Sequence, residues 1–297
     1  MIKKAVIPAA GLGTRLLPAT YAQPKEMLPC GRKPTIQYVV EELAAAGVKD
    51  ILIITGRTKR ALEDHFDHDL SLFEKLENSG KIKLLEEMKF IEKLHLNIFF
   101  TRQAQPTGLA DAIYLAKDFI DNESFYVALG DTIILSNPLG QFLRRLMKVH
   151  SEKSAAGTIG LEKVRKEDVK NYGIISGTQT AEGIWNVKDL IEKPNIKAAP
   201  SQLAICGRYI FTSEIFSAIE KTPVGLGNEK QLTDSIIKLL DEKEEVWGLE
   251  MSTGERRYDI GNPTTYAIAF IELSLQDAEI SKALKPYLKD LVKNFKD

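Results

Sequence analysis

Over its first 150 residues the chain alternates between short, continuously apolar runs and longer amphipathic segments. A run such as residues 51–54, with no polar residue inside it, is typical of a strand that is buried on both faces. An amphipathic segment of helical length follows each run, which predicts a parallel sheet covered by helices on both faces. The strands expected are residues 5–8, 50–55, 95–101 and 125–129, and the helices are residues 36–46, 59–66 and 109–119.

The second half of the chain has a different pattern. Its apolar runs are shorter and are separated by turn residues, which favours a mixed or antiparallel extension of the sheet. The strands expected here are residues 155–164, 172–175, 184–191 and 203–211, and the helices are residues 214–220 and 231–242. There is no repeat and no linker rich in Pro, Gly or Ser. We therefore expect residues 1–297 to form one α/β domain.

Two further segments have a helical pattern. Residues 70–94 are highly charged and are split by Gly80, which predicts a solvated helical insertion. Residues 264–295 predict a helical tail that Pro286 should break, because proline removes a backbone donor. The apolar stripe expected after this break consists of Tyr287, Leu288, Leu291, Val292 and Phe295.

Composition narrows the classes of partner and compartment. The chain has 40 basic and 41 acidic residues, so no overall field attracts nucleic acid or a membrane, and we expect neither as a partner. Cys30 and Cys206 lack metal-ligand spacing and suit a reducing compartment. An apolar strand begins near the first residue, and no apolar run reaches 18 residues. We therefore expect a soluble, cytoplasmic protein without a signal peptide or a membrane span.

Residues 9–15 read AAGLGTR and directly follow the first expected strand. Gly11 and Gly13 have no Cβ, so backbone N–H groups there can approach a polyphosphate. Two glycines after a strand can also form an ordinary tight turn. Arg15 and Lys25 add a planar fork and a compact charge, both suited to phosphate oxygens. Together these residues predict a phosphate-binding loop.

Two commoner phosphate loops do not fit this stretch. A Walker-type loop needs a Lys-Ser/Thr pair at a fixed distance after its glycines, and none follows here. A dinucleotide-binding fingerprint needs a third glycine where the chain has Leu16. A dehydrogenase is therefore disfavoured, and the loop indicates a different nucleotide chemistry.

Two carboxylates lie where a metal could be held. Asp131 follows the apolar run 125–129 and a glycine, and ligands of parallel sheets bind beyond the carboxyl ends of the strands. Asp259 lies in the string RYDIGNP, between an apolar stretch and a turn. Either residue alone could be a helix cap or a turn former. Combined with the phosphate-binding loop, they point to a metal-assisted transfer.

Several strings, in order from residue 3 to about residue 270, resemble the bacterial-type UTP–glucose-1-phosphate uridylyltransferases of the sugar-nucleotidyltransferase superfamily. They are PAAGLGTRLLPAT, PKEMLP, IQYVVEEL, TGRTKRALEDHFD, YGII, VKDLIEKP, APSQLAICGRYIF, EKQLTD and RYDIG. The resemblance implies an α/β fold with a Rossmann-like, three-layer mixed sheet of the nucleotide-diphospho-sugar transferase type and a helical C-terminal tail. It also implies Mg²⁺ dependence, a homodimer or homotetramer, and formation of UDP-glucose and pyrophosphate from UTP and glucose 1-phosphate.

The resemblance also implies a division of labour along the chain. Residues 1–150 would bind the nucleotide, residues 151–262 the sugar phosphate, and residues 263–297 would form the tail. The nucleotide-binding residues implied are Ala9, Ala10, Gly11, Leu12, Gly13, Thr14, Arg15, Lys25, Gln103, Gly108 and Asp131. Gln103 would read the edge of the pyrimidine ring, although from the residue alone it could simply lie on the surface.

The remaining roles concern the metal, the sugar and the reaction. Asp131 and Asp259 would hold Mg²⁺. The sugar-phosphate residues implied are Tyr172, Gly173, Glu192, Lys193 and Glu229, and the catalytic residues are Arg15, Lys25 and Lys193. Arg15 would contact the triphosphate, Lys25 would help pyrophosphate leave, and Lys193 would hold the sugar phosphate. Without the resemblance, Tyr172 could be a core residue, and Glu192 with Lys193 an exposed ion pair.

Three departures from the family pattern leave alternatives open. The chain has Tyr21 where the family commonly has Lys, GLADA at 108–112 where it has GLGHA, and Thr132 in place of a second acidic residue. GLADA resembles the thymidylyltransferase branch, so an enzyme that uses dTTP is the main alternative. A non-catalytic regulatory subunit on the same fold is another, but such a subunit typically lacks the loop cations or the metal carboxylates.

Overall fold

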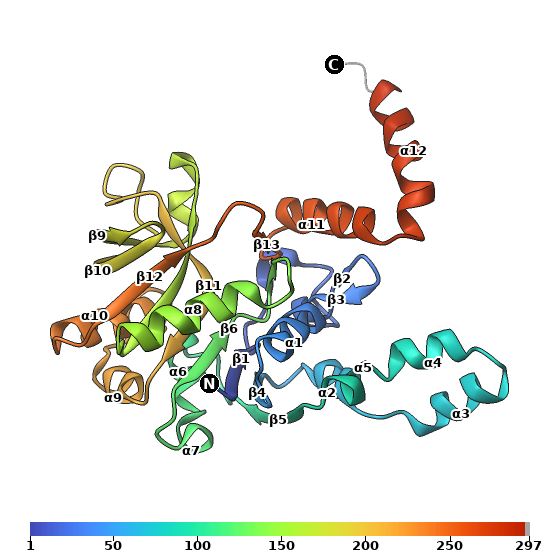
Figure 1. The fold of residues 1–297 in the computed structure, drawn as a ribbon, viewed down its shortest axis with the longest axis horizontal. Helices are drawn as coiled ribbons and strands as arrows, with labels where there is room; N and C mark the ends of the chain where they lie inside the picture. Colours follow the sequence, from blue (N-terminus) through green and yellow to red (C-terminus); the bar gives the residue numbers. More distant parts are fainter. Residues whose placement is uncertain (295–297) are drawn as a thin grey trace.

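The computed structural model describes residues 1–294, except for the side chain of Leu226, and a nine-stranded mixed sheet lies at its centre (Figure 1). The strands of this sheet are β1 (Lys4–Pro8), β4 (Asp50–Thr55), β5 (Asn97–Arg102), β6 (Phe125–Ala128), β8 (Gly157–Lys163), β9 (Gly173–Ala181), β10 (Ile184–Glu192), β11 (Leu203–Phe211) and β12 (Val246–Glu250). Their order is β5-β4-β1-β6-β11-β8-β12-β10-β9. The strands from β5 to β6 are parallel, and β11 begins the mixed half by pairing antiparallel with β6.

The parallel half of the sheet forms because its strands are apolar on both faces. In β1, Ala5 and Ile7 pack into the core on one side of the sheet, while Val6 packs into the core on the other side. This alternation follows from the two-residue period of a strand. All three side chains are fully buried. The predicted α/β fold with a parallel first half is therefore confirmed.

Helices cover both faces of this sheet and complete the three layers (Figure 1). One face is covered by α1 (Thr35–Ala45), α2 (Arg60–Phe66) and α8 (Gln141–Glu152), and the other by α6 (Leu109–Tyr114), α7 (Lys117–Ile120), α9 (Glu214–Lys221) and α10 (Leu232–Asp241). The single helix predicted over residues 109–119 is instead the pair α6 and α7. The N–H groups of Leu115 and Ala116 bond to carbonyls three residues back, which tightens the backbone and ends α6.

Smaller elements connect these layers. The 3₁₀ turns are η1 (Thr14–Leu16), η2 (Lys25–Met27), η3 (Lys166–Asn171) and η4 (Leu226–Asn228). Two short ribbons pair β2 (Pro29–Cys30) with β3 (Lys33–Pro34), and β7 (Thr132–Leu135) with β13 (Arg256–Asp259). The second ribbon brings the end of β13 back to the strand that directly follows Asp131.

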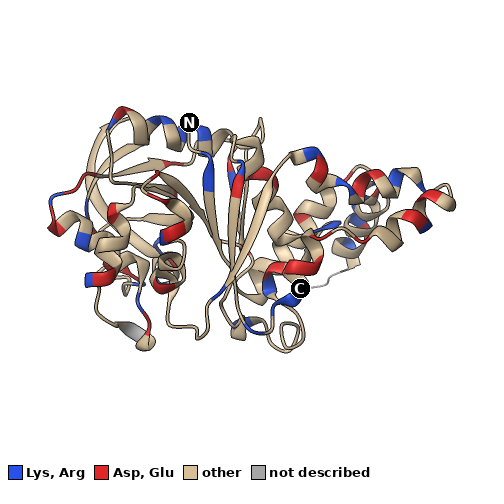
Figure 2. Cartoon of the chain, turned by 90° about the horizontal axis from the view of Figure 1, so that it is seen from below, with Lys and Arg blue, Asp and Glu red and all other residues tan. Residues whose placement is uncertain are grey.

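The predicted helical insertion consists of three short helices that extend away from the sheet in Figure 1. They are α3 (Leu70–Asn78), α4 (Ile82–Met88) and α5 (Phe90–Leu94). Gly80, with φ of 68°, lies between α3 and α4. Figure 2 shows basic and acidic residues interspersed along these helices, as expected for a solvated segment.

The C-terminal region is helical, but its break lies before the predicted position. α11 (Pro263–Gln276) ends at Asp277, whose carboxylate accepts from the N–H groups of Glu279 and Ile280. α12 (Ile280–Asn294) then continues through Pro286, so the prediction of a break there is wrong. α12 has no buried residue among those described, and water can therefore bind the carbonyl that proline leaves without a donor.

The apolar stripe predicted on this last helix faces outward. Tyr287 is 62% exposed and Val292 is 68% exposed, Leu291 is also exposed, and Leu288 is half-buried. Phe295, the last residue of the predicted stripe, lies outside the described residues. Within residues 1–294, no helix combines the length and the apolar character that crossing a membrane requires.

Candidate active site

The loop after β1 lies at the carboxyl end of the parallel strands. The N–H of Ala9 donates to the carbonyl of Ile54 at 2.8 Å, which attaches the start of the loop to β4. Gly13 has φ of 68°, and its carbonyl accepts from Thr20 Oγ1 at 2.8 Å. The exposed residues of the loop are Gly11, Leu12, Thr14 and Arg15, whereas Ala9 and Ala10 are buried. The loop therefore presents backbone and one guanidinium where the sequence predicts a polyphosphate.

Lys25 and Asp131 form an ion pair beside this loop. Their side chains are only 17% and 18% exposed, and a Cβ on Gly11 would lie 3.9 Å from Lys25 Nζ. Burial opposes the charge of Lys25, but the charges of Asp131 and Glu26 outweigh it and raise the pKa of Lys25. Burial likewise opposes the charge of Asp131, and Lys25 holds the pKa of Asp131 below its usual value. Both groups therefore remain ionised at neutral pH.

A second ion pair, Glu26 with Lys59, lies close enough to interact with the first. Its atoms are 2.8 Å apart, and the side chains are 1% and 5% exposed. Burial raises the pKa of Glu26 and lowers the pKa of Lys59, while each partner's charge opposes that shift. The sequence analysis assigned no role to either residue, although both lie in the strings PKEMLP and TGRTKRALEDHFD. The charges of Glu26 and Lys59 therefore act on the same group of residues as those of Lys25 and Asp131.

The pairing of β13 with β7 brings Asp259 next to Thr132, the residue after Asp131. The N–H of Ile260 donates to the carbonyl of Asp131 at 3.2 Å. The Asp259 carboxylate accepts from the N–H of Gly261 at 2.7 Å. A Cβ on Gly261 would lie 2.8 Å from Asp259 Oδ1 and 3.2 Å from Arg15 Nη2, so this glycine leaves room for both side chains. The structure thus brings Arg15, Asp131 and Asp259 together, as predicted.

These two carboxylates fit a magnesium ion that arrives with a nucleotide. No group of three or more His, Cys, Asp or Glu among the described residues could hold a metal by itself. Mg²⁺ in nucleotide sites is usually held by one or two carboxylates, with phosphate oxygens and water completing the shell. The lowered pKa of Asp131 keeps this carboxylate ionised. The donor set therefore suits a metal shared between the protein and the triphosphate.

Gln103 lies at the end of β5, on the same edge of the sheet. Its N–H donates to the carbonyl of Thr55 at 2.9 Å, and its side chain is 9% exposed. Its Nε2 donates to the carbonyl of Gly108 at 3.1 Å, with a longer contact of 3.4 Å to Thr107 Oγ1. The carboxamide is thus fixed against the loop before α6. Gln103 is therefore not a freely solvated surface residue, which was the alternative that the residue alone left open.

The loop around Gly108 is held against the EKQLTD segment. Gly108 has φ of 121°, and a Cβ there would lie 2.4 Å from the carbonyl oxygen of Lys230. Lys230 donates its N–H to Thr107 at 2.8 Å and accepts from Ala110 at 3.1 Å. Its ammonium lies 3.6 Å from Asp111, so the unusual acid of the GLADA stretch pairs with a cation of the neighbouring segment.

The residues predicted for the sugar phosphate come together at the ends of β9 and β10. Gly173 pairs with Glu192, and Lys193 donates its N–H to the carbonyl of Tyr172 at 3.0 Å. Glu192 accepts from Thr233 Oγ1 at 2.7 Å and lies 3.1 Å from Lys193 Nζ. A Cβ on Gly173 would lie 3.1 Å from Glu192 Oε2. The glycine therefore lets this carboxylate approach the strand.

Arg257 contacts both a residue predicted for the sugar phosphate and one predicted for the metal, and no role was predicted for it from the sequence. Its guanidinium stacks 4.5 Å from the ring of Tyr172 and lies 3.8 Å from Asp259 Oδ2. Its Nε also donates to Glu162. Arg257 directly precedes the tyrosine of RYDIG, but nothing in the sequence shows which residues it meets.

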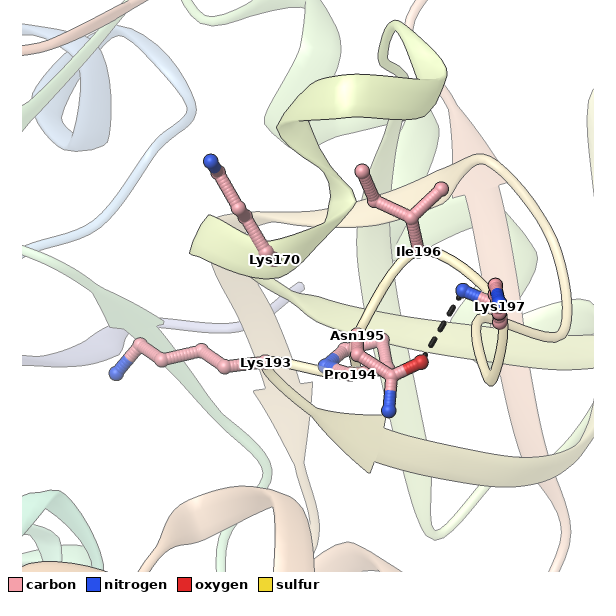
Figure 3. A pocket seen from close by; sticks show the side chains of 6 residues that line it. All are labelled: Lys170, Lys193, Pro194, Asn195, Ile196 and Lys197. Atoms are coloured by element: carbon pink, nitrogen blue, oxygen red, sulfur yellow. Dashed lines mark hydrogen bonds between the residues drawn. The ribbon is translucent and has the colours of Figure 1, made fainter.

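A cavity of about 570 Å³ opens at Lys193, one of the residues predicted for the sugar phosphate (Figure 3). It is lined by Lys170, Lys193, Pro194, Asn195, Ile196 and Lys197. In Figure 3 the ammonium groups of Lys170 and Lys193 extend toward the same side, and that of Lys197 lies on the other. Glu229 is exposed, and the contacts that the structure describes for it, from Gly225 and Gln231, tie it to its own loop.

The model of the nucleotidyl transferase family matches residues 4–275, which include every site residue described above. The chain therefore belongs to the nucleotidyl transferases. The UTP–glucose-1-phosphate uridylyltransferase of Bacillus subtilis (strain 168) is 45% identical over 291 residues, which are 98% of this chain and 97% of the relative. That of Staphylococcus epidermidis (strain ATCC 12228 / FDA PCI 1200) is 46% identical over 290 residues, 98% of each chain. Within the family, the chain thus belongs to the UTP–glucose-1-phosphate uridylyltransferases.

Solved structures agree with this placement. A UTP-bound enzyme of this type from Acinetobacter baumannii is 34% identical, with a TM-score of 0.88 and full coverage of both chains. A UDP-glucose pyrophosphorylase complexed with UDP-glucose is 37% identical, with a TM-score of 0.80 over 92% of this chain and 97% of that one. The predicted fold and family are both confirmed.

Proposed function

We propose that this chain transfers a uridylyl group from UTP to glucose 1-phosphate, forming UDP-glucose and pyrophosphate. The observation that carries this proposal is the convergence of Arg15, Lys25, Asp131 and Asp259 at the open end of the parallel strands, in a chain that belongs to the uridylyltransferases. A non-catalytic subunit typically lacks the loop cations or the metal carboxylates, and all four of these residues are present in this chain. A regulatory subunit is therefore the weaker alternative.

The reaction needs alignment and charge neutralisation more than proton transfer. The phosphate oxygen of glucose 1-phosphate is already an ionised nucleophile, so no general base is required. It forms a new bond to the α-phosphorus of UTP in line with the breaking bond, whose electron pair leaves on pyrophosphate. Repulsion between the two anions is the main barrier, and fixed cations lower it. Lys25 and Arg15 provide such charge on the nucleotide side.

The metal completes this arrangement. When bound, Mg²⁺ neutralises phosphate charge and fixes the geometry of the triphosphate. Asp131 and Asp259 would hold it, and the ionised state of Asp131 makes that carboxylate a ready ligand. Lys25 pairs with Asp131 in the structure and lies beside Gly11, from where its ammonium can also reach phosphate oxygens in the loop.

The second half of the chain would hold the sugar phosphate. Lys193 would contact the phosphate, and Glu192 would accept hydrogen bonds from sugar hydroxyls while Thr233 orients it. Tyr172 and Gly173 would border this site, and we keep Glu229 as a prediction for the adjoining loop. Residues 1–150 would correspondingly form the nucleotide half of the same domain.

For the base, we infer a preference for UTP over dTTP. Gln103 is fixed beside Gly108, where its carboxamide can read a pyrimidine edge. The GLADA stretch, which favoured the thymidylyl branch, uses Asp111 to pair with Lys230. The departure from GLGHA thus has a structural explanation that does not involve the base.

The activity is tested by incubating the protein with UTP, glucose 1-phosphate and Mg²⁺ and identifying the product by chromatography and mass spectrometry. We expect UDP-glucose in an amount equal to the pyrophosphate released, and only when both substrates are present. Release of orthophosphate from UTP without glucose 1-phosphate would instead indicate a hydrolase.

We also propose a cytoplasmic homo-oligomer. Both cysteines are free and buried, which suits a reducing compartment. Exposed apolar side chains on α11 and α12, Ile268, Phe270, Ile271, Tyr287 and Val292, support self-association, because large exposed apolar patches usually mark interfaces. Whether the assembly is a dimer or a tetramer follows from its mass in solution.

A further inference from the structure

The largest fully buried side chain among those described is a charged one, Arg208 on β11. Its partner is Glu42 of α1, at 2.7 Å, and the two side chains are 0% and 1% exposed. Replacing a buried ion pair by apolar residues of similar size is often neutral or stabilising, so stability alone does not account for such a pair. The contacts of the guanidinium indicate another role.

Each nitrogen of the Arg208 guanidinium donates a hydrogen bond. Nε and Nη2 donate to the same carboxylate oxygen of Glu42, at 3.0 and 2.7 Å. Nη2 also donates to the carbonyl of Thr132 at 2.8 Å, and Nη1 lies 3.5 Å from the carbonyl of Leu129. The N–H of Thr132 donates to that same Leu129 carbonyl at 3.3 Å. The guanidinium therefore holds both ends of a four-residue turn, and Asp131 lies inside this turn.

The strand that carries Arg208 is shaped to approach the turn. Gly207 has φ of 78°, and the pairing of β11 with β8 is irregular between Ile205 and Tyr209. The Gly207 carbonyl accepts from the N–H of Leu129 at 3.0 Å and from Arg208 Nη1 at 3.0 Å. A Cβ on Gly207 would lie 3.2 Å from Leu129 Cδ1, so this glycine lets the strand lie close to the Leu129 side chain.

We propose that Arg208 is a positioning residue for Asp131: it fixes the turn 129–132 so that the Asp131 carboxylate faces the metal and the triphosphate, and Glu42 orients the guanidinium. Arg208 touches neither substrate nor metal and acts through the backbone of this turn. The inference rests on the proposed role of Asp131 as a metal ligand.

The test uses the double variant Glu42→Leu/Arg208→Met, which removes both buried charges at once and so leaves neither unpaired. Mn²⁺ replaces Mg²⁺ as the probe, and its binding to the complex of protein and UTP is followed by electron paramagnetic resonance. We expect at least a tenfold weaker Mn²⁺ affinity. We also expect faster hydrogen exchange in the peptide that contains residues 129–132, measured without metal or nucleotide.

The matched control is Leu239→Ala on α10, a fully buried residue in the core on the other face of the sheet. It should lower the melting temperature without changing Mn²⁺ affinity or exchange in the turn. A folded double variant with wild-type Mn²⁺ affinity and wild-type exchange in residues 129–132 would overturn the proposal. If the double variant does not fold, Arg208→Lys keeps the charge but loses the fork, and the same two changes are expected.

Asp131→Asn separates this inference from the proposed function. If that variant binds Mn²⁺ as the wild type does, Asp131 is not a ligand and the metal assignment fails. Exchange in the turn then still decides whether Arg208 fixes it. If Asp131→Asn loses Mn²⁺ and the double variant keeps it, only the positioning role is wrong.

Discussion

Lys25 and Asp131, which meet beside the loop after β1, both stay charged near neutral pH. The pKa of Lys25 is raised and that of Asp131 is lowered, despite burial, because each stabilises the charge of the other. Glu26 and Lys59 form a second, more deeply buried pair that interacts with the first. A site with these fixed charges can bind a polyanion without first taking up or releasing a proton.

Arg15 is the most exposed of the cations assigned to catalysis on the nucleotide side, and it offers the clearest single-residue test. We expect Arg15→Ala to lower kcat/KM about 10²- to 10³-fold, or roughly 2.7–4 kcal/mol, the scale for removing one well-placed donor to a transition state. The melting temperature should not change, because the side chain is exposed. Steady-state pyrophosphate release measures the loss.

Arg60→Ala is the matched control, since Arg60 is an exposed arginine that pairs with Asp64 on its own helix. It should leave kcat/KM within about twofold of the wild type, as expected for a weak surface pair. Equal losses in the two variants would remove the special role of Arg15.

Arg15 and Asp131 could be chosen from the sequence for a physical reason. Arg15 follows a glycine turn, Asp131 follows an apolar run, and the ends of parallel strands meet at one edge. Arg208 and Lys59 could not, because their importance depends on burial and on partners 166 and 33 residues away. Such tertiary pairing leaves no local pattern in a single sequence.

At the scale of elements, the loop before α6 depends on a close backbone contact. A Cβ at position 108 would lie 2.4 Å from the carbonyl oxygen of Lys230. A residue other than glycine there would also have to adopt a positive φ. We expect Gly108→Ala to separate the two segments, to displace Gln103, and to raise the KM for UTP more than that for glucose 1-phosphate. Initial rates with each substrate varied in turn measure this difference.

Gly80→Ala provides the comparison, because Gly80 also has a positive φ but no atom lies within 4 Å of its Cβ position. It should lower the free energy of unfolding by about 1–2 kcal/mol from backbone strain alone and leave both KM values unchanged. A Gly108→Ala variant that behaves like Gly80→Ala would contradict the importance of the contact.

The packing of α8 on the sheet should make stability depend on pH. His150 is 6% exposed, with Nδ1 3.0 Å from Thr158 Oγ1 and Nε2 3.3 Å from Ser124 Oγ, and burial lowers its pKa from 6.5 to about 4. Between these values the unfolded chain binds a proton that the folded chain does not. Stability is therefore lost as the pH falls from about 6.5 to about 4, by up to about 3 kcal/mol.

Urea unfolding of the wild type and of His150→Gln at several pH values between 7 and 4 checks this prediction. The variant should lack this part of the pH dependence, whereas His68→Gln, at an exposed position, should retain it. Parallel stability curves for the wild type and His150→Gln would show that His150 does not titrate in this way.

Element boundaries show where a sequence pattern stops being informative. The buried strand β4 has the predicted bounds because its apolar run is continuous. The division of α6 from α7 and the continuity of α12 through Pro286 were not predicted. The first depends on which backbone carbonyls the N–H groups of Leu115 and Ala116 bond, and the second on the exposure of α12, and a single sequence does not specify either.

At the scale of the whole molecule, the proposed assembly rests on the exposed apolar residues of α11 and α12. None of the described residues of α12 is buried, so this helix contributes little to the core of its own chain. We expect a solution mass that is two or four times 33.2 kDa. Light scattering measures it directly.

The double variant Tyr287→Ser/Val292→Ser should lower this mass while leaving the melting temperature nearly unchanged, because both side chains are exposed within one chain. The control is Leu70→Ser on the exposed insertion, which should leave the mass unchanged. Phe119 is not suitable for this purpose, because its side chain packs on the core. A wild-type mass of 33.2 kDa would contradict the proposed assembly.

The proposed reaction is tested most directly by pyrophosphate release with glucose 1-phosphate and either UTP or dTTP, with Mg²⁺ and after its removal by EDTA. We expect rapid release with UTP, at least tenfold slower release with dTTP, and none after EDTA. Faster release with dTTP would make the chain a thymidylyltransferase. No release with either nucleotide would contradict the account of the site as a whole.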